Sequence, residues 1–373
     1  MTYIETAAAL ADLIAAVRRE PRVAVDTEAA SFHRYHDRIY LVQLSTARQT
    51  ALIDPLAVHD LSAVGTVLAD PLIEKVFHDA DYDLRVLDRD YGFRATRLFD
   101  TRIAAQLLGE PAIGLAALLD KYAGVKLAKE HQKADWSQRP LPPAMLDYAA
   151  ADTHHLLTLR DALERQLEAL GRRTWAAEEF AQLESLRWTG VAQGEADTHL
   201  RVKGARGLHP RSLAVFRELH RWRETLAERD DRAPFRVIGN DALLAVSRAM
   251  PQGPPDLAQI RELPPSLARR HGAALLDAVA RARAIPEAEL PRLARAPRPP
   301  RDSGWDARVE RLKAARNRIA ATLGLDPGVL CGRTTLETIA QAQPRDRIEL
   351  ARTGALRRWQ EEVLGDALLE ALR

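Results

Sequence analysis

Four acidic side chains, spread over three separated segments, are the residues of this sequence best suited to chemistry. Asp26 and Glu28 lie in VAVDTEAASF, Asp83 in VFHDADYDLRVL and Asp152 in LDYAAADTHHLL, where Tyr148 stands four residues earlier. Mg²⁺ and Mn²⁺ prefer carboxylate oxygens. A pair of such cations about 3.5–4 Å apart can stabilise both the attacking and the leaving oxygen of a phosphodiester. The residue set therefore indicates a two-cation site for cutting phosphodiesters.

The spacing within two of these segments places side chains together. Asp26 and Glu28 are two apart on an expected strand, so both point to one face and could ligate the same ion. Tyr148 and Asp152 are four apart on an expected helix, so they share a face. The Tyr148 hydroxyl can both donate and accept, which suits it to holding an attacking water. Taken singly, each pair is more often an ordinary strand end or helix face, so the hypothesis depends on the whole set.

Other polar residues near these segments are open to two interpretations. Asp79 and Asp81 could assist Asp83 or simply stabilise the start of a helix, where acids are favoured. His78 ends an expected strand and is more often a hydrogen-bonded structural histidine than a contact for substrate. Arg139, in KEHQKADWSQRPLPP, could bind phosphate or pair with an acid. No Cys and His residues have zinc spacing, and no Gly-rich phosphate loop is present.

The first half of the chain alternates strands and helices. Short β-branched runs predict strands at 22–26, 39–45, 50–53, 75–78 and 97–101. The loop after the first strand is short enough to make the first two strands an antiparallel pair, and the rest predicts a mixed sheet covered by helices. We expect an amphipathic helix over the first 20 residues and one long helix from Pro143 to Leu170.

Beyond about residue 175 the strand signals fade, and apolar residues follow helical spacing. Two helical sets of similar length and order are separated by a Pro- and Arg-rich stretch, PEAELPRLARAPRPPRDSG. We therefore divide the chain into a mixed α/β domain, a connecting helix or linker, a first helical domain, an extended linker and a second helical domain. Their ranges are 1–172, 173–207, 208–285, 286–304 and 305–373.

Composition narrows the class of protein. The chain has one cysteine, Cys331, so it can form no internal disulfide, which fits a reducing cytoplasm. We expect no membrane association, since no apolar run approaches the ~18 residues of a membrane span, and the N-terminus lacks a secretory pattern. Residues 1–170 carry 19 Lys and Arg against 25 Asp and Glu, whereas residues 171–373 carry 35 against 27. This asymmetry suggests that the N-terminal half binds metal and that the C-terminal half holds a polyanion.

The ordered motifs resemble those of the DEDD exonuclease superfamily, in the branch whose third motif carries tyrosine. VAVDTEAASFHRYHDRIYLVQLS, VFHDADYDLRVL, ADWSQRPL and DYAAADTHHLL are similar to the ribonuclease D family in particular. The two helical sets more loosely resemble the helicase-and-RNase-D C-terminal (HRDC) domain, which that family carries twice. The resemblance implies a ribonuclease H-like exonuclease domain followed by two small all-α domains.

The resemblance also implies roles for single residues. Asp26, Glu28 and Asp152 should bind one cation, Asp26 should bridge to a second, and Asp83 should hold that second ion. Tyr148 should position the attacking water. The expected cofactors are two divalent cations, Mg²⁺ or Mn²⁺. The expected activity is 3′-to-5′ removal of 5′-mononucleotides from RNA, with the single-stranded 3′ ends of tRNA precursors and other structured RNAs as substrates.

Two alternatives stay open at this point. An exonuclease with the same mechanism could act mainly on DNA, although the sequence holds no polymerase or helicase segment. The chain could instead be an inactive RNA-binding scaffold, although all four acids and the tyrosine are present. A monomer is the expected state, because no heptad or evident interface stripe is present.

Overall fold

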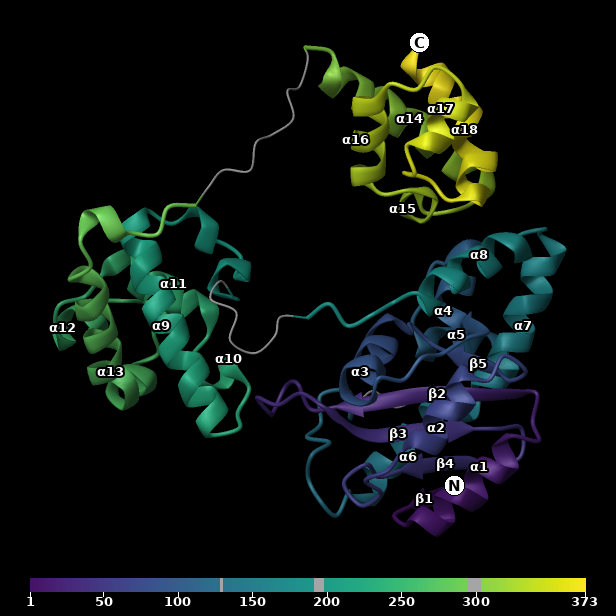
Figure 1. The fold of residues 1–373 in the computed structure, drawn as a ribbon, viewed down its shortest axis with the longest axis horizontal. Helices are drawn as coiled ribbons and strands as arrows, with labels where there is room; N and C mark the ends of the chain where they lie inside the picture. Colours follow the sequence, from purple (N-terminus) through teal and green to yellow (C-terminus); the bar gives the residue numbers. More distant parts are fainter. Residues whose placement is uncertain (128–129, 191–197, 294–302) are drawn as a thin grey trace.

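The computed structural model describes residues 1–127, 130–190, 198–293 and 303–373. Figure 1 shows a domain built on a β-sheet and two helical bundles that follow it in the chain. No helix in the described ranges is both long and apolar enough to cross a membrane.

A six-stranded sheet forms the centre of the first domain. The strands are β1 Thr2–Ile4, β2 Arg22–Ala29, β3 Ile39–Ser45, β4 Thr50–Ile53, β5 Glu74–Phe77 and β6 Leu98–Asp100. Their spatial order is β1-β4-β3-β2-β5-β6. Strand β2 pairs with β3 antiparallel and with β5 parallel, so it is a central strand of a mixed sheet. The predicted antiparallel pair and mixed sheet are confirmed.

Eight helices belong to this domain in its described part. They are α1 Ala7–Val17, α2 Ser62–Ala69, α3 Asp81–Tyr91, α4 Thr101–Leu108, α5 Leu115–Ala123, α6 Pro143–His154, α7 Leu156–Ala169 and α8 Arg173–Glu184. The sequence prediction was wrong at the N-terminus, where a strand precedes the helix. Residues Thr2–Ile4 pair with β4, which buries Ile4, and Thr6 then caps α1.

The long helix predicted from Pro143 to Leu170 is also wrong, because it breaks at His155. That residue has φ −102° and ψ 2° and separates α6 from α7. Helix α6 packs on β2, β3 and β4, whereas α7 packs on β2, β5, α4 and α5. The chain must change direction to cover both regions, which breaks the helix. The apolar spacing continues through the break, which is why the sequence predicted one helix.

The two helical sets have the same element order. The first contains α9 Pro210–Arg229, α10 Pro234–Val237, α11 Asn240–Ala249, α12 Pro254–Ala258 and α13 Pro265–Arg283. The second contains α14 Trp305–Leu323, α15 Pro327–Leu330, α16 Arg333–Ala342, α17 Arg347–Arg352 and α18 Arg358–Leu372. Short 3₁₀ turns lie at Thr198–Arg201, Ala205–Gly207 and Glu287–Glu289.

The similarity of the two sets extends to the backbone after their third helices. Met250 ends α11 with φ 47°, and Gln343 ends α16 with φ 46°, both in the left-handed region. Two residues later the Gln252 amide donates to Asp256, and the Arg345 amide donates to Glu349, at 2.8 Å in each case. The repeat is therefore clear in architecture although weak in residue identity.

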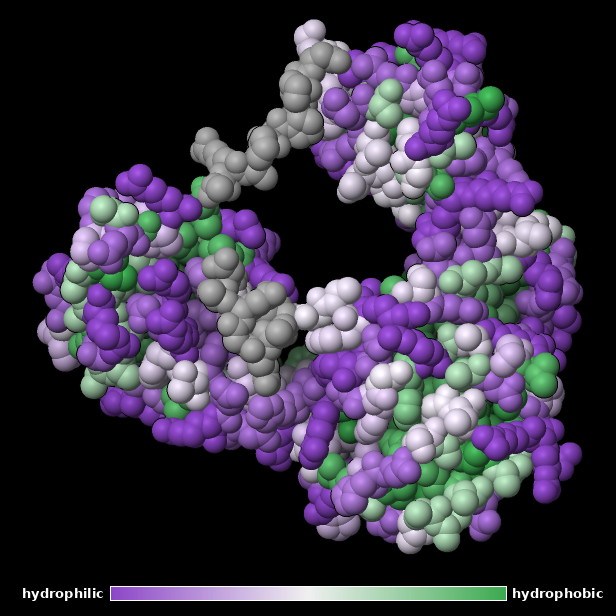
Figure 2. All heavy atoms as spheres, in the orientation of Figure 1, coloured by the Kyte–Doolittle hydropathy of each residue, from purple (hydrophilic) through white to green (hydrophobic). Residues whose placement is uncertain are grey.

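The two helical domains differ in how they meet the sheet domain. The second shares one continuous hydrophobic cluster with it, whereas the first has a cluster of its own. Polar contacts join the first helical domain to the β2–β3 loop of the sheet domain. The Ala233 amide donates to the His33 carbonyl, and Asp231 accepts a hydrogen bond from the Tyr35 amide. In Figure 2 the surfaces of both bundles are mostly hydrophilic, as expected for Arg-rich helices.

Candidate metal centre

The centre is built on β2, between its two neighbouring strands. Asp26 stands opposite Gln43 of β3, and Glu28 stands opposite Leu41. A register shift between Glu28 and Ala29 ends the regular pairing immediately afterwards. The two acids therefore occupy fixed positions near the end of β2, where the strand is paired with β3 and its pairing with β5 has already ended at Ala24.

A third carboxylate reaches these two from helix α6. One ligand oxygen from each of Asp26, Glu28 and Asp152 can be chosen so that all lie within 4.8 Å of one another. Since α6 packs directly on β2, the helix carries Asp152 to the strand. Spacing of this kind lets three carboxylates ligate a single cation.

Asp83 enters the same cleft from the first turns of α3. The cleft has a volume of about 570 Å³, and its walls include Asp26, Glu28, Asp83, Tyr148 and Asp152. The Thr27 hydroxyl donates a hydrogen bond to Asp83, which is only 6% exposed. All four acids singled out in the sequence thus face one cleft.

Burial and mutual repulsion disfavour the charged forms of these acids. Burial, followed by repulsion from Asp83, Glu28 and Asp152, raises the pKa of Asp26 well above its usual range. Burial likewise raises the pKa of Glu28, and it raises the pKa of Asp83 and of Asp152 to about 7. Divalent cations would neutralise this excess of negative charge, so the donor set fits such ions.

Tyr148 lies beside this cluster with its hydroxyl next to Asp152. Burial and the nearby carboxylates raise the pKa of the phenol above its usual value. Its ring centroid lies 6.2 Å from that of Trp136, which is 1% exposed and is therefore part of the packing. Tyr148 is thus a neutral, fixed hydroxyl at the edge of the cluster.

The two remaining sequence candidates have different surroundings. His78 lines the cleft, and its Nδ1 lies 2.9 Å from the Thr101 hydroxyl. Burial lowers the pKa of His78 to about 4, so its ring is neutral near pH 7. Arg139 is absent from the described walls of the cleft, and its guanidinium instead binds Asp54 through Nε at 2.6 Å and Nη2 at 2.7 Å. Pairing with an acid, the alternative left open above, is what the structure shows for Arg139.

Four polar residues in the described wall of the cleft were not predicted from the sequence, namely Thr27, Tyr82, Arg102 and Gln132. Thr27 separates the two acids of the first motif, which is the one signal that could have pointed to it. Arg102 and Gln132 carry no motif of their own. The acids Asp79 and Asp81 differ, since Asp79 lines the cleft and pairs with Arg102, whereas Asp81 pairs with Arg85 along α3.

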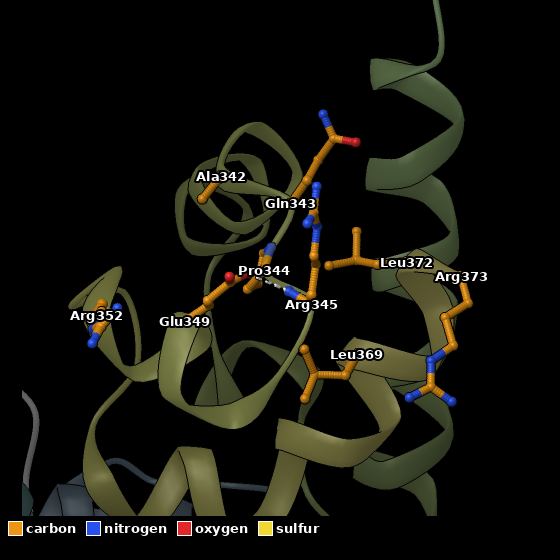
Figure 3. A pocket seen from close by; sticks show the side chains of 9 residues that line it. All are labelled: Ala342, Gln343, Pro344, Arg345, Glu349, Arg352, Leu369, Leu372 and Arg373. Atoms are coloured by element: carbon orange, nitrogen blue, oxygen red, sulfur yellow. Dashed lines mark hydrogen bonds between the residues drawn. The ribbon is translucent and has the colours of Figure 1, made fainter.

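A larger hollow, about 870 Å³, lies on the second helical domain. Figure 3 shows Arg345, Arg352 and Arg373 around it, together with Glu349 and two leucines. Its described walls hold one carboxylate side chain, so it lacks the donors that a divalent cation needs. We therefore place the candidate centre in the smaller, acidic cleft.

Comparison with known proteins shows the family of the chain. A family model described as 3′-5′ exonuclease matches residues 1–168, and the HRDC domain model matches residues 212–279 and 306–372. A ribonuclease D from Pseudomonas paraeruginosa is 33% identical over 99% of this chain and 97% of its own length. This chain belongs to the ribonuclease D family. Membership makes it a 3′-5′ exoribonuclease, and therefore a hydrolase.

Further relatives and solved structures support membership of the same family. The ribonuclease D of Escherichia coli K12 is 36% identical over 77% of this chain and 76% of its own length. The crystal structure of Escherichia coli RNase D matches with a TM-score of 0.72 and 30% identity, covering 99% of this chain and 98% of that one. The catalytic core of RRP6 from Trypanosoma brucei matches with a TM-score of 0.65 and 32% identity, covering 75% of this chain and 79% of that one.

Proposed function

We propose that this ribonuclease D family member trims RNA from its 3′ end with the help of two divalent cations, Mg²⁺ or Mn²⁺, and releases 5′-mononucleotides. The observation that carries the proposal is the cluster of Asp26, Glu28 and Asp152, with Asp83 in the same cleft. Such cations, when bound, supply positive charge to the attacking and leaving oxygens of an in-line displacement. The family likeness adds that the reaction runs from the 3′ end.

The residues divide the binding of the cations between them. Asp26, Glu28 and Asp152 hold the ion on the side of the attacking water, as their mutual distances allow. Asp26 and Asp83 line the same cleft and repel each other electrostatically, so a second cation would be held by these two carboxylates. Thr27 fixes the Asp83 carboxylate by its hydrogen bond.

Tyr148 orients the attacking water rather than deprotonating it. Its raised pKa keeps the phenol protonated at neutral pH, so its hydroxyl can donate a hydrogen bond but is a poor base. The packing of its ring against Trp136 holds the hydroxyl in one place. Orientation of this kind lowers the entropic part of the barrier.

The natural substrates are single-stranded 3′ ends of tRNA precursors and other structured RNAs. The matching Escherichia coli enzyme is described as an exoribonuclease involved in structured RNA processing. In this chain, Arg345, Arg352 and Arg373 surround the hollow of Figure 3, and their guanidinium groups have no carboxylate partner among the described residues. Such groups bind phosphates without reading sequence. They hold the body of the RNA while its end enters the acidic cleft.

We further propose that the protein acts as a monomer in the cytoplasm. The relatives that support the family are bacterial enzymes, and the single cysteine of the chain fits a reducing compartment. Sedimentation of the purified chain would test the oligomeric state.

The test of the function is a 5′-labelled RNA ladder. We expect the labelled RNA to become shorter by one nucleotide at a time in Mg²⁺ or Mn²⁺. Shortening should stop in excess EDTA and resume when the cation is restored. The matched DNA oligonucleotide should be degraded more slowly. Equal or faster loss of DNA would favour the DNA exonuclease, and an unchanged RNA ladder in every cation would favour the inactive scaffold.

A further inference from the structure

One basic side chain lies in the wall of the acidic cleft. Apart from the neutral His78, Arg102 is the single basic residue among the described residues that line it. Arg102 stands in the first turn of α4 and is 39% exposed. The four acids repel the phosphates of an approaching RNA strand. The positive charge of Arg102 offsets part of this repulsion.

The position of Arg102 is fixed by a buried carboxylate, Asp100. That carboxylate is 1% exposed and accepts the backbone amides of Arg102 and Ile103 at the start of α4. It also accepts the amides of Asp79 and Ala80 in the loop between β5 and α3. One side chain therefore joins the two segments that carry Arg102 and Asp79.

The result is an ion pair at the edge of the cleft. The Nη1 of Arg102 donates to Asp79, whose backbone lies in the left-handed region with φ 67°. A residue other than glycine adopts this conformation at a cost, which the bonds to Asp100 offset. A guanidinium has five N–H donors, and one hydrogen bond of the Arg102 side chain is present. The other donors have no partner among the described residues and can meet a ligand.

We propose that Arg102 is a substrate-binding residue, which grips the phosphate adjacent to the scissile one on the strand that enters the cleft, and that Asp79 orients it. The inference rests on the proposed function and adds a phosphate contact to it. Bound cations would neutralise the scissile phosphate, but the next phosphate must also pass the acids. Guanidinium groups bind phosphate oxygens through two parallel hydrogen bonds, which gives both strength and direction.

The experiment combines protein variants with an altered RNA. Single-turnover trimming is measured for the wild type, Arg102→Ala, Arg102→Lys and Asp79→Asn on a short labelled RNA. A second RNA carries a neutral 2′-O-methyl methylphosphonate at the linkage adjacent to the scissile one, and a third carries the same 2′-O-methyl group with an ordinary phosphodiester. Arg85→Ala is the matched control, because Arg85 pairs with Asp81 on α3 outside the cleft.

We expect Arg102→Ala to raise the RNA concentration for half-maximal rate about tenfold, as for the removal of one charged hydrogen bond. The saturating rate should stay within about threefold. The slope of log affinity against log salt should become shallower by about 0.7, the value for one bound phosphate on a single strand. Arg102→Lys should retain that slope but lose part of the affinity, and Arg85→Ala should change neither.

The methylphosphonate decides between binding and mere structural support. If Arg102 grips that phosphate, neutralising it removes most of the difference between wild type and Arg102→Ala, as in a double-mutant cycle. If the difference persists undiminished on the neutral linkage, the proposal is overturned. Should Arg102→Ala fail to fold, Arg102→Lys and Asp79→Asn supply the same comparison. A wild-type chain that trims no RNA would instead refute the proposed function, so the two failures are distinct.

Discussion

The rings of Trp175 and Trp359 stack with their centroids 4.9 Å apart and their planes 18° from parallel. Trp175 belongs to α8 of the exonuclease domain and Trp359 to α18 of the second helical domain. Beside them, Glu178 accepts the backbone amides of Arg358 at 2.8 Å and of Trp359 at 3.0 Å. A carboxylate of one domain thus satisfies the free N–H groups at the start of a helix in another.

This contact predicts that Trp359→Ala destabilises the exonuclease domain as well as the helical one. Trp359 is 2% exposed and belongs to the cluster that both domains share. The loss should be about 3–5 kcal/mol, the range for truncating a buried tryptophan, and Glu178→Gln should cost ~1 kcal/mol. Urea unfolding followed by circular dichroism measures both.

Trp222→Ala provides the matched control, since Trp222 also follows an arginine but packs in the separate cluster of the first helical domain. It should leave the unfolding of the exonuclease domain unchanged. Equal destabilisation of that domain by both tryptophan variants would contradict the predicted role of the contact.

Asp26→Asn should abolish trimming while leaving RNA binding almost intact. Its carboxylate is central to the cluster, and bound cations are expected to lower the barrier by several kcal/mol, so the rate should fall by at least about a thousandfold when they are lost. Single-turnover rates and filter binding separate the two effects. Asp12→Asn, which removes an exposed acid on α1, should change neither. Residual metal-dependent trimming near the wild-type rate would exclude Asp26 as a ligand.

The stability of the cation-free protein should decrease with pH. Burial raises the pKa of Asp83 and Asp152 from 3.8 to about 7. Between about pH 4 and pH 7 the folded chain therefore holds protons that the unfolded chain has released, and folding is progressively disfavoured as pH rises. Urea midpoints in EDTA at pH 5 and pH 8 measure the trend.

Asp152→Asn removes one of these titrating groups, so its stability should depend less on pH than that of the wild type. Mg²⁺ should restore more stability at pH 8 than at pH 5, because it competes with the bound protons. A wild-type protein in EDTA that gains stability across this range relative to Asp152→Asn would contradict the assignment.

Tyr148→Phe should lower the saturating rate about tenfold to a hundredfold, the effect of a misplaced reactant. Since burial keeps the Tyr148 hydroxyl protonated, the pH dependence of the remaining activity should keep its shape. Cation affinity should also be unchanged, because the three carboxylates of the cluster remain and the hydroxyl only forms a hydrogen bond with one of them, Asp152. The measurement is a pH–rate profile for both proteins. Loss of a basic limb in the variant would show that the tyrosine acts as a base.

Neutralising the arginines of Figure 3 should weaken RNA binding and its dependence on salt. Arg345→Gln, Arg352→Gln and Arg373→Gln together should make the slope of log affinity against log salt shallower by up to about 0.7 for each phosphate that the variant no longer binds. The control removes the same charge from the first helical domain, with the substitutions Arg261→Gln, Arg269→Gln and Arg270→Gln. Equal reductions of affinity in both triple variants would show that net charge, and not this hollow, holds the RNA.

The sequence predicted those parts of the site that local spacing controls. Asp26 and Glu28 share a face because they are two apart, and this holds whatever surrounds the strand. Asp83 could be chosen among five neighbouring acids only through the family resemblance, since its direction depends on how α3 meets β2. The break at His155 was missed because α6 and α7 share continuous apolar spacing but cover different parts of the sheet.

Relationships between distant segments had no local signal. Arg102 lies in the cleft because Asp100 binds two segments together, which is a property of the folded chain alone. Arg139 and Asp54 are likewise brought together by packing, and each alone is an ordinary charged residue. The stack of Trp175 on Trp359 could not be inferred from the two helices that carry it.

The register of β2 makes catalytic competence depend on correct folding. Asp26 and Glu28 face the cleft only while the strand is aligned with β3 as observed, and a slip by one residue would turn both acids to the opposite face. A chain that has paired its strands incorrectly would then be unable to capture the cations. The capacity to degrade RNA therefore arises only together with the native sheet.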